Sequence, residues 1–263
     1  MSDGEGLEFH QRRSRLKPPL RPDAEIVSAY RAALGSHASH ILLLGVTEEL
    51  ADIGHETTAL DISRKMIAHA WPGDTATRKA IRGDWLDMPF GERRFSAAIG
   101  DGILAAIPPP QYTTLAAQFA RALLPGARIV LRLYETPERG EAVEQVREAA
   151  MGGTIRGFHA FKWRLAMALA TEANSAAVPV ARIHQTFEST FPDRQALSAK
   201  TGWSMEDVSE IDAYRGGALI YQFPTRAQLV AHLPASFSNV RFLPSGSYEL
   251  AERCPLLVAD FVP

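Results

Sequence analysis

The sequence is poor in cysteine: Cys254 is the only one in 263 residues. A single cysteine excludes an internal disulfide framework and any metal site built from several thiolates. We therefore expect a protein of a reducing compartment, and we expect no metal centre.

Long apolar runs are missing as well. No stretch approaches the ~20 consecutive apolar residues that span a bilayer. The first ten residues, MSDGEGLEFH, are polar and acidic and do not resemble a signal peptide. With 46% hydrophobic residues, the chain can still bury a large core. These features predict a globular cytoplasmic protein without a membrane segment.

Excess charge is also absent, because the formal net charge is −2. The whole chain therefore gives no electrostatic reason to bind DNA or another polyanion. The exception is the basic segment 10–21, with Arg12, Arg13, Arg15, Lys17 and Arg21. This segment is either a solvated arm that folds over the core or a contact for RNA or anionic lipid. Its prolines predict an extended path over 18–22.

Strand and helix patterns alternate through the first half of the chain. Short apolar runs predict parallel strands buried on both faces, and amphipathic stripes predict the helices between them. Such alternation specifies an α/β fold with a doubly wound parallel sheet and right-handed crossovers. We expect strands over 41–45, 57–61, 78–82, 95–100 and 127–133, and helices over 22–34, 63–71 and 111–124.

The second half is longer than the sheet needs. An amphipathic helix is expected over 154–170, with Phe158, Phe161, Leu165 and Leu169 on one side. Strands are expected over 218–223, 240–243 and 255–262. We therefore divide the chain into an arm and cap helix (1–35), a core (36–140), an inserted helical or mixed lobe that acts as a lid (141–215) and strands that complete the sheet (216–263).

Glycine and aspartate recur where the predicted strands end. Gly45 ends the first strand, Asp61 ends the second, Gly83-Asp84-Trp85 follows the third, and Asp101 follows the fourth. Ligands of parallel sheets bind at the carboxyl ends of the strands. This order resembles class I S-adenosylmethionine-dependent methyltransferases over about residues 36–135. The resemblance implies that cofactor and a doubly wound, mostly parallel, Rossmann-like sheet of seven strands.

The resemblance assigns the nucleoside to two of these acids. Asp61, with Ile62 beside it, would accept hydrogen bonds from the ribose hydroxyls, although capping of the next helix is the alternative. Asp84, after Gly83, would accept from the adenine amine, and the Trp85 backbone N–H would face the base.

The methionine end of the cofactor would lie at the loop Gly45-Val46-Thr47. The family has an acid where this chain has Leu43, and glycines where it has Thr47 and Glu49. These substitutions restrict the loop backbone.

After the fourth strand, Asp101-Gly102-Ile103 would line the cofactor and the acceptor entrance. A turn-forming aspartate before glycine is the competing interpretation of Asp101.

The absence of two sequence features narrows the class of methyl acceptor. Methyltransferases that act on base amines commonly have Asn or Asp-Pro-Pro-aromatic after strand four, where this chain has Gly100-Asp101-Gly102-Ile103. The two cysteines of cytosine C5 chemistry are missing. A small-molecule acceptor is the leading choice. Methyl transfer depends mainly on positioning, so no catalytic residue is assigned; candidate bases are His159, His184, Tyr112 and Tyr214.

Three other functions remain open. A nicotinamide-dependent oxidoreductase would need a phosphate loop of the G-x-G-x-x-G type, which the segment GVTEEL does not provide. The absence of the family's glycines at Thr47 and Glu49 leaves open a protein of the same fold that binds the cofactor or a partner without turnover. The basic arm allows an RNA methyltransferase, which strongly salt-dependent RNA binding would support.

Overall fold

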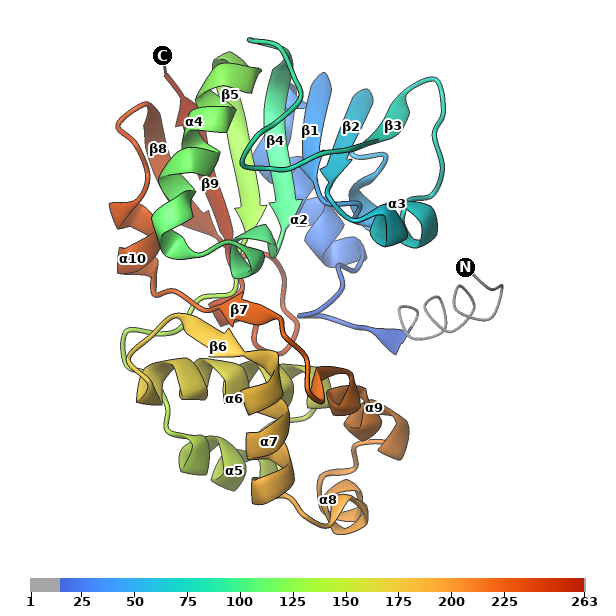
Figure 1. Ribbon diagram of the computed structural model, residues 1–263, viewed down its shortest axis with the longest axis vertical. Coiled ribbons are helices and arrows are strands. Elements are labelled where there is room, and N and C mark those ends of the chain that lie inside the picture. Colours follow the sequence, from blue (N-terminus) through green and yellow to red (C-terminus); the bar gives the residue numbers. More distant parts are fainter. Residues whose placement is uncertain (1–14, 263) are drawn as a thin grey trace.

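The computed structural model describes residues 15–262 (Figure 1). Its centre is a seven-stranded sheet in the order β3-β2-β1-β4-β5-β9-β8, in which β9 runs antiparallel to both its neighbours. The sequence-based expectation of a mostly parallel seven-stranded sheet is confirmed. The strands are β1 His40–Leu44, β2 Glu56–Asp61, β3 Arg78–Arg82, β4 Phe95–Asp101, β5 Leu123–Arg132, β8 Phe237–Leu243 and β9 Leu256–Phe261.

Two hydrophobic layers sandwich this sheet. Alternation along β1 sends Ile41 and Leu43 into one layer and Leu42 and Leu44 into the other. Helices α2 (Ala24–Leu34) and α3 (Arg64–Ala70) cover the first layer, and α4 (Tyr112–Ala122) and α10 (Arg226–Ala231) cover the second. The apolar strand runs therefore reflect burial on both faces.

A helical lobe lies beyond the carboxyl ends of the parallel strands, below the sheet in Figure 1. Its core is rich in aromatic rings and also contains Tyr134, which follows β5. The lobe consists of α5 Val143–Met151, α6 Phe158–Glu172, β6 Ala177–Pro179, α7 Val180–Thr190, α8 Arg194–Thr201, α9 Met205–Ser209, the 3-10 helix η5 Glu210–Tyr214 and β7 Ile220–Gln222.

Helix α6 is the centre of the lobe. The sequence predicts an amphipathic helix, but the structure buries it on almost every side, including His159 and Lys162. Helices α5 and α7 and strand β6 pack around it. The one-sided stripe was therefore a wrong prediction, because small and aromatic residues on the remaining faces also meet neighbours.

Strand β7 corrects the expected boundary of the lobe. The run 218–223 does form a strand, but β7 pairs with β6 in a separate two-stranded sheet. The main sheet is completed by β8 and β9 only. The lobe therefore extends to about residue 222. The sheet to which a short strand belongs is decided by its pairing partner, which the local sequence does not encode.

The N-terminal arm also departs from expectation. Residues 18–20 form a turn in which the Leu20 N–H donates to Lys17 O at 2.9 Å, so the segment is not extended. The arm then leads into α2, whose N-cap Asp23 accepts from the Ile26 N–H at 2.9 Å. Much of the basic segment 10–21 lies outside the described residues.

The aromatic core of the lobe can be tested with Phe161. Its side chain is fully buried, and its ring centroid lies 5.0 Å from that of Trp203 and 5.6 Å from that of Phe191. We expect Phe161→Ala to lower the free energy of unfolding by about 3–5 kcal/mol in urea denaturation. Met205→Ala, at an exposed position of the same lobe, should change it by about 0.5 kcal/mol or less. An equally small decrease in the free energy of unfolding for both variants would contradict a packed lobe.

Candidate cofactor and acceptor site

Three residues expected from the sequence meet at the carboxyl edge of the sheet. Gly45 has a φ of 85°, and a Cβ on it would stand 4.0 Å from Asp61 Oδ2 and 3.9 Å from Trp85 Cζ2. The carbonyl of Leu60 holds the group together, because it accepts from the Gly45 N–H at 2.8 Å and from Trp85 Nε1 at 2.6 Å. The open side of Gly45 therefore faces both a carboxylate and an indole.

Asp61 is a carboxylate without a cationic partner among the described residues. Its Oδ1 accepts from the Ser63 N–H at 2.8 Å, and within residues 15–262 no group donates to Oδ2. Burial raises the pKa of Asp61, and the Ser63 bond lowers it by less. Ser63, and not Asp61, caps α3 by accepting from the Met66 N–H. An oxygen with spare acceptor capacity suits a ligand that donates hydroxyl protons.

The rim beside Asp61 is apolar and open. Ile62 leaves 61% of its surface exposed directly after the strand. Val46 is buried, whereas Thr47 is only partly covered and makes no side-chain cap for the short 3-10 helix Glu48–Leu50. A planar base over Ile62 would remove apolar surface from water.

Asp84 is exposed at the end of β3. Its Oδ1 accepts from the Leu86 N–H at 2.8 Å, and the Asp87 N–H reaches Asp84 O at 3.3 Å. Asp84 thus shapes the turn that follows β3. Gly83 is required here for packing, because a Cβ would stand 2.8 Å from Leu60 Cδ1.

Asp101 does not face the open edge. It forms an ion pair with Arg132, in which Nη2 lies 3.0 Å from Oδ2 and Nε binds Oδ1. Arg132 is fully buried, and burial lowers the pKa of this guanidinium. The charge and hydrogen bond of Asp101, together with Tyr134 and Tyr248, raise the pKa by more, so that it lies above its usual range. Both carboxylate oxygens are used, so the side chain serves the fold in this structure.

Gly102 and Ile103, which follow Asp101, lie against the protein interior. Gly102 has a φ of 65°, and a Cβ there would come within 2.4 Å of Tyr134 Cε2, so only glycine fits. Ile103 is buried in the layer under α4. Neither presents a side chain to a ligand, but their backbone stays at the end of β4.

Tyrosines extend the Arg132 cluster to distant segments. Tyr30 of α2 donates to Gly100 O at 2.7 Å, and Tyr134 donates to Pro19 O of the arm at 2.9 Å. Tyr248 lies 3.1 Å from Arg132 Nη1. Sequence reasoning missed these residues. A lone arginine inside the apolar run of β5 was the available signal, because a buried charge requires a partner.

Helix α6 has two buried polar atoms without a hydrogen-bond partner among residues 15–262. They are His159 Nδ1 and Trp163 Nε1, one turn apart. Burial, helped by Lys162, lowers the pKa of His159, which favours the neutral ring. The Trp163 indole packs edge-on against Tyr134, with ring centroids 5.2 Å apart. This face of α6 therefore adjoins the end of β5.

The other candidate bases lie elsewhere. Tyr112 donates to Leu104 O beneath α4, and burial raises its pKa. His184 Nε2 lies 3.2 Å from Asp212 Oδ1 in the lobe. Tyr214 is buried beneath the Lys162 ammonium, which lies 5.0 Å from its ring centroid.

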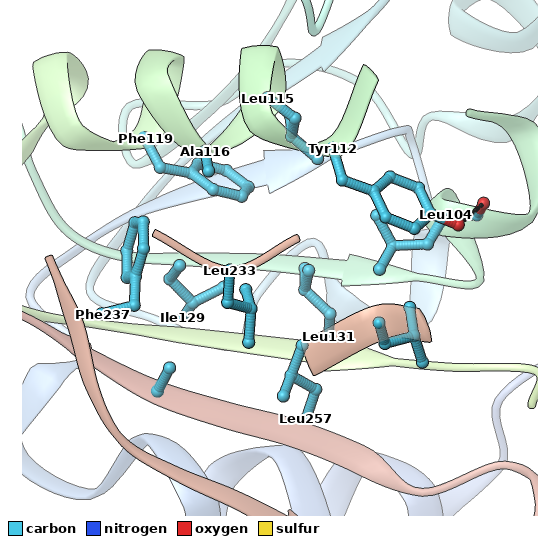
Figure 2. Close-up of a pocket in the computed structure, with 12 residues that line it drawn as sticks. Leu104, Tyr112, Leu115, Ala116, Phe119, Ile129, Leu131, Leu233, Phe237 and Leu257 are labelled. Carbon is cyan, nitrogen blue, oxygen red and sulfur yellow. Dashed lines mark hydrogen bonds between the residues drawn. The ribbon is translucent and has the colours of Figure 1, made fainter. Parts of the chain in front are cut away.

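A small cavity of about 30 Å³ lies between α4 and the sheet, where Figure 2 shows Tyr112 and Phe119 facing Leu131 and Leu257. Its lining is almost wholly apolar, so it offers no chemistry for methyl transfer. In residues 15–262 no three His, Cys, Asp or Glu side chains are grouped as metal ligands. No helix in that range is long and apolar enough to cross a membrane.

Comparison with known proteins bears on this arrangement. Residues 45–131, roughly a third of the chain, match the sequence model of a family described as a methyltransferase domain. Over that range the chain is similar to a methyltransferase domain, and Gly45, Asp61 and Trp85 all lie within it. No curated protein sequence matches the chain.

Solved structures of methyltransferases share the fold of this chain. An S-adenosylmethionine-dependent methyltransferase from Methanosarcina mazei is 17% identical, with a TM-score of 0.50 over 94% of this chain and 98% of that one. DesVI from Streptomyces venezuelae is 15% identical, with a TM-score of 0.51 over 100% of this chain and 99% of that one. Human N-acetylserotonin methyltransferase in complex with S-adenosylmethionine is 12% identical, with a TM-score of 0.53 over 100% of this chain and 57% of that one. At these identities the likeness establishes the class I fold.

Asp61 gives a direct test of the cofactor site. We expect Asp61→Ala to weaken S-adenosylhomocysteine binding about tenfold to a hundredfold in calorimetry, because charge-assisted bonds are lost. Asp61→Asn should weaken it less, since an amide oxygen still accepts.

Stability separates this role from a structural one. Because burial raises the pKa of Asp61, its ionised form costs the folded state stability, and this cost develops as pH rises through the raised pKa. Asp61→Asn should therefore melt no lower than the parent at pH 7 without ligand. Normal binding together with a clearly lower melting temperature would show instead that Asp61 only supports the fold.

Proposed function

We propose that this chain transfers a methyl group from S-adenosylmethionine to a small-molecule acceptor held between the carboxyl edge of the sheet and the lobe. The observation that carries the proposal is the group formed by Gly45, Asp61 and Trp85. It places a carboxylate with a free acceptor oxygen beside a glycine cradle at two adjacent strand ends.

Each residue would have a distinct task in binding. Asp61 would accept from the ribose hydroxyls, and Ile62 and Trp85 would enclose the base. Asp84, whose second oxygen makes no contact with the described residues, would accept from the adenine amine. The bound cofactor supplies an electrophilic methyl group on sulfonium sulfur, so the remaining task of the protein is to orient the acceptor and exclude water.

The lobe and the arm favour a small acceptor. Helix α6 lies across the carboxyl ends of the strands, and the arm is bound to Tyr134 at the same edge (Figure 1). A macromolecule would have to displace both. His159 Nδ1 and Trp163 Nε1, which have no hydrogen-bond partner in the described part of the chain, would give an enclosed acceptor polar partners, since buried polar groups normally have one. The human structural relative named above takes its name from a small molecule, N-acetylserotonin.

The basic arm gives less support to RNA as the acceptor. Arg15 lies 2.9 Å from Glu206, and Arg21 lies 3.1 Å from Glu48. These cations are already paired within the protein, which reduces the charge left for phosphates. Arg12 and Arg13 lie outside the described residues.

Two measurements test the proposed function. Calorimetry should detect S-adenosylhomocysteine binding and no heat from NAD or NADP. Transfer from methyl-labelled cofactor should then place label in the small-molecule fraction of an extract. Cofactor binding without transfer to any acceptor would indicate a non-catalytic protein, salt-sensitive labelling of RNA would indicate an RNA methyltransferase, and preference for a dinucleotide would refute the cofactor.

A further inference from the structure

The loop after β1 lacks what the family uses for the amino-acid end of the cofactor. Leu43 is fully buried where an acid is expected, and Thr47 and Glu49 replace glycines. The amino-acid end carries an ammonium and a carboxylate, and both need partners when they leave water. Other groups at this loop must therefore meet these two charges if the cofactor binds.

An arginine from a distant segment reaches this loop. Arg21 Nε binds Glu49 Oε1, and Arg21 Nη2 lies 3.1 Å from Glu48 Oε2. The Arg21 side chain leaves 24% of its surface exposed, and the Glu49 side chain leaves 16%. A half-buried pair of opposite charges thus stands at the position of the lost third glycine.

The arm fixes Arg21 from both sides. On the N-terminal side, Pro19 is buried and its carbonyl accepts from Tyr134 at the end of β5. On the C-terminal side, Pro22 is buried and Asp23 caps α2. The guanidinium is therefore presented to the loop after β1 by a backbone that is anchored to the sheet edge and to a helix.

We infer that Arg21 and Glu49 form the subsite for the zwitterionic amino-acid end of the cofactor, with Arg21 binding the carboxylate and Glu49 the ammonium. This inference rests on the proposed function, because it presupposes S-adenosylmethionine as the ligand. Guanidinium matches a carboxylate with paired N–H donors, and a carboxylate matches an ammonium. A zwitterion adds no net charge to the pair, so each charge keeps an opposite partner.

The test compares ligands that differ by single charged groups. S-adenosylmethionine carries both groups, its decarboxylated form keeps only the ammonium, and 5′-methylthioadenosine has neither. Calorimetry on the full chain should show that the parent loses about tenfold to a hundredfold in affinity when the carboxylate is removed. Arg21→Ala should bind the first two ligands with nearly equal affinity, and Arg21→Lys should restore part of the difference.

Glu49→Gln should weaken both ammonium-bearing ligands by a similar factor and leave 5′-methylthioadenosine unchanged. The matched control is Arg78→Ala, which removes the ion pair between a largely covered arginine and the exposed Asp52 from the amino edge of the sheet. This control should keep the ligand ratios of the parent.

Each other outcome is decisive. If Arg21→Ala weakens all three ligands alike, Arg21 only ties down the arm, and the subsite is wrong. An unchanged carboxylate effect in Arg21→Ala would also overturn it, while leaving the cofactor assignment intact. A parent chain that binds none of the three ligands would instead overturn the proposed function.

Discussion

The buried guanidinium of Arg132 is the interaction on which the carboxyl edge of the sheet depends. It joins β5 to β4 through Asp101 and contacts Tyr248 near the C-terminus, and its backbone N–H donates to Tyr30 of α2. Tyr134, two residues on, ties in the arm and packs against Trp163 of the lobe. Leaving one charge of such a buried pair alone typically costs about 3–5 kcal/mol. Core, arm and lobe therefore meet around one cation, which holds their relative positions.

Two aspartates at the ends of β2 and β4, which flank β1, have opposite electrostatic environments. Asp101 faces a buried cation that occupies both its oxygens, whereas Asp61 has lost water without gaining a cation. A desolvated carboxylate with a free oxygen is unfavourable for the fold alone and favourable for a ligand that donates hydrogen bonds. This contrast is why Asp61, and not Asp101, carries the argument for cofactor binding.

The arm and the lobe enclose the edge from different directions. Arg21 reaches the loop after β1, where the backbone has lost glycines, and α6 brings buried polar atoms toward the end of β5. Long-range partners of this kind can supply charges that the local loop no longer provides. The altered loop of this chain is therefore compatible with cofactor binding, provided that the arm stays docked.

The sequence by itself determined the sheet, its helices and the candidate residues Gly45, Asp61 and Trp85, because strand burial and strand-end residues are local patterns with a fixed period. It did not determine that both carboxylate oxygens of Asp101 bind Arg132, that β7 belongs to the lobe, or that α6 is buried on nearly every side. Each of these depends on a partner tens of residues away, and local spacing contains no information on which distant side chain will supply the opposing charge, the pairing edge or the covering surface. Only the tertiary structure decided them.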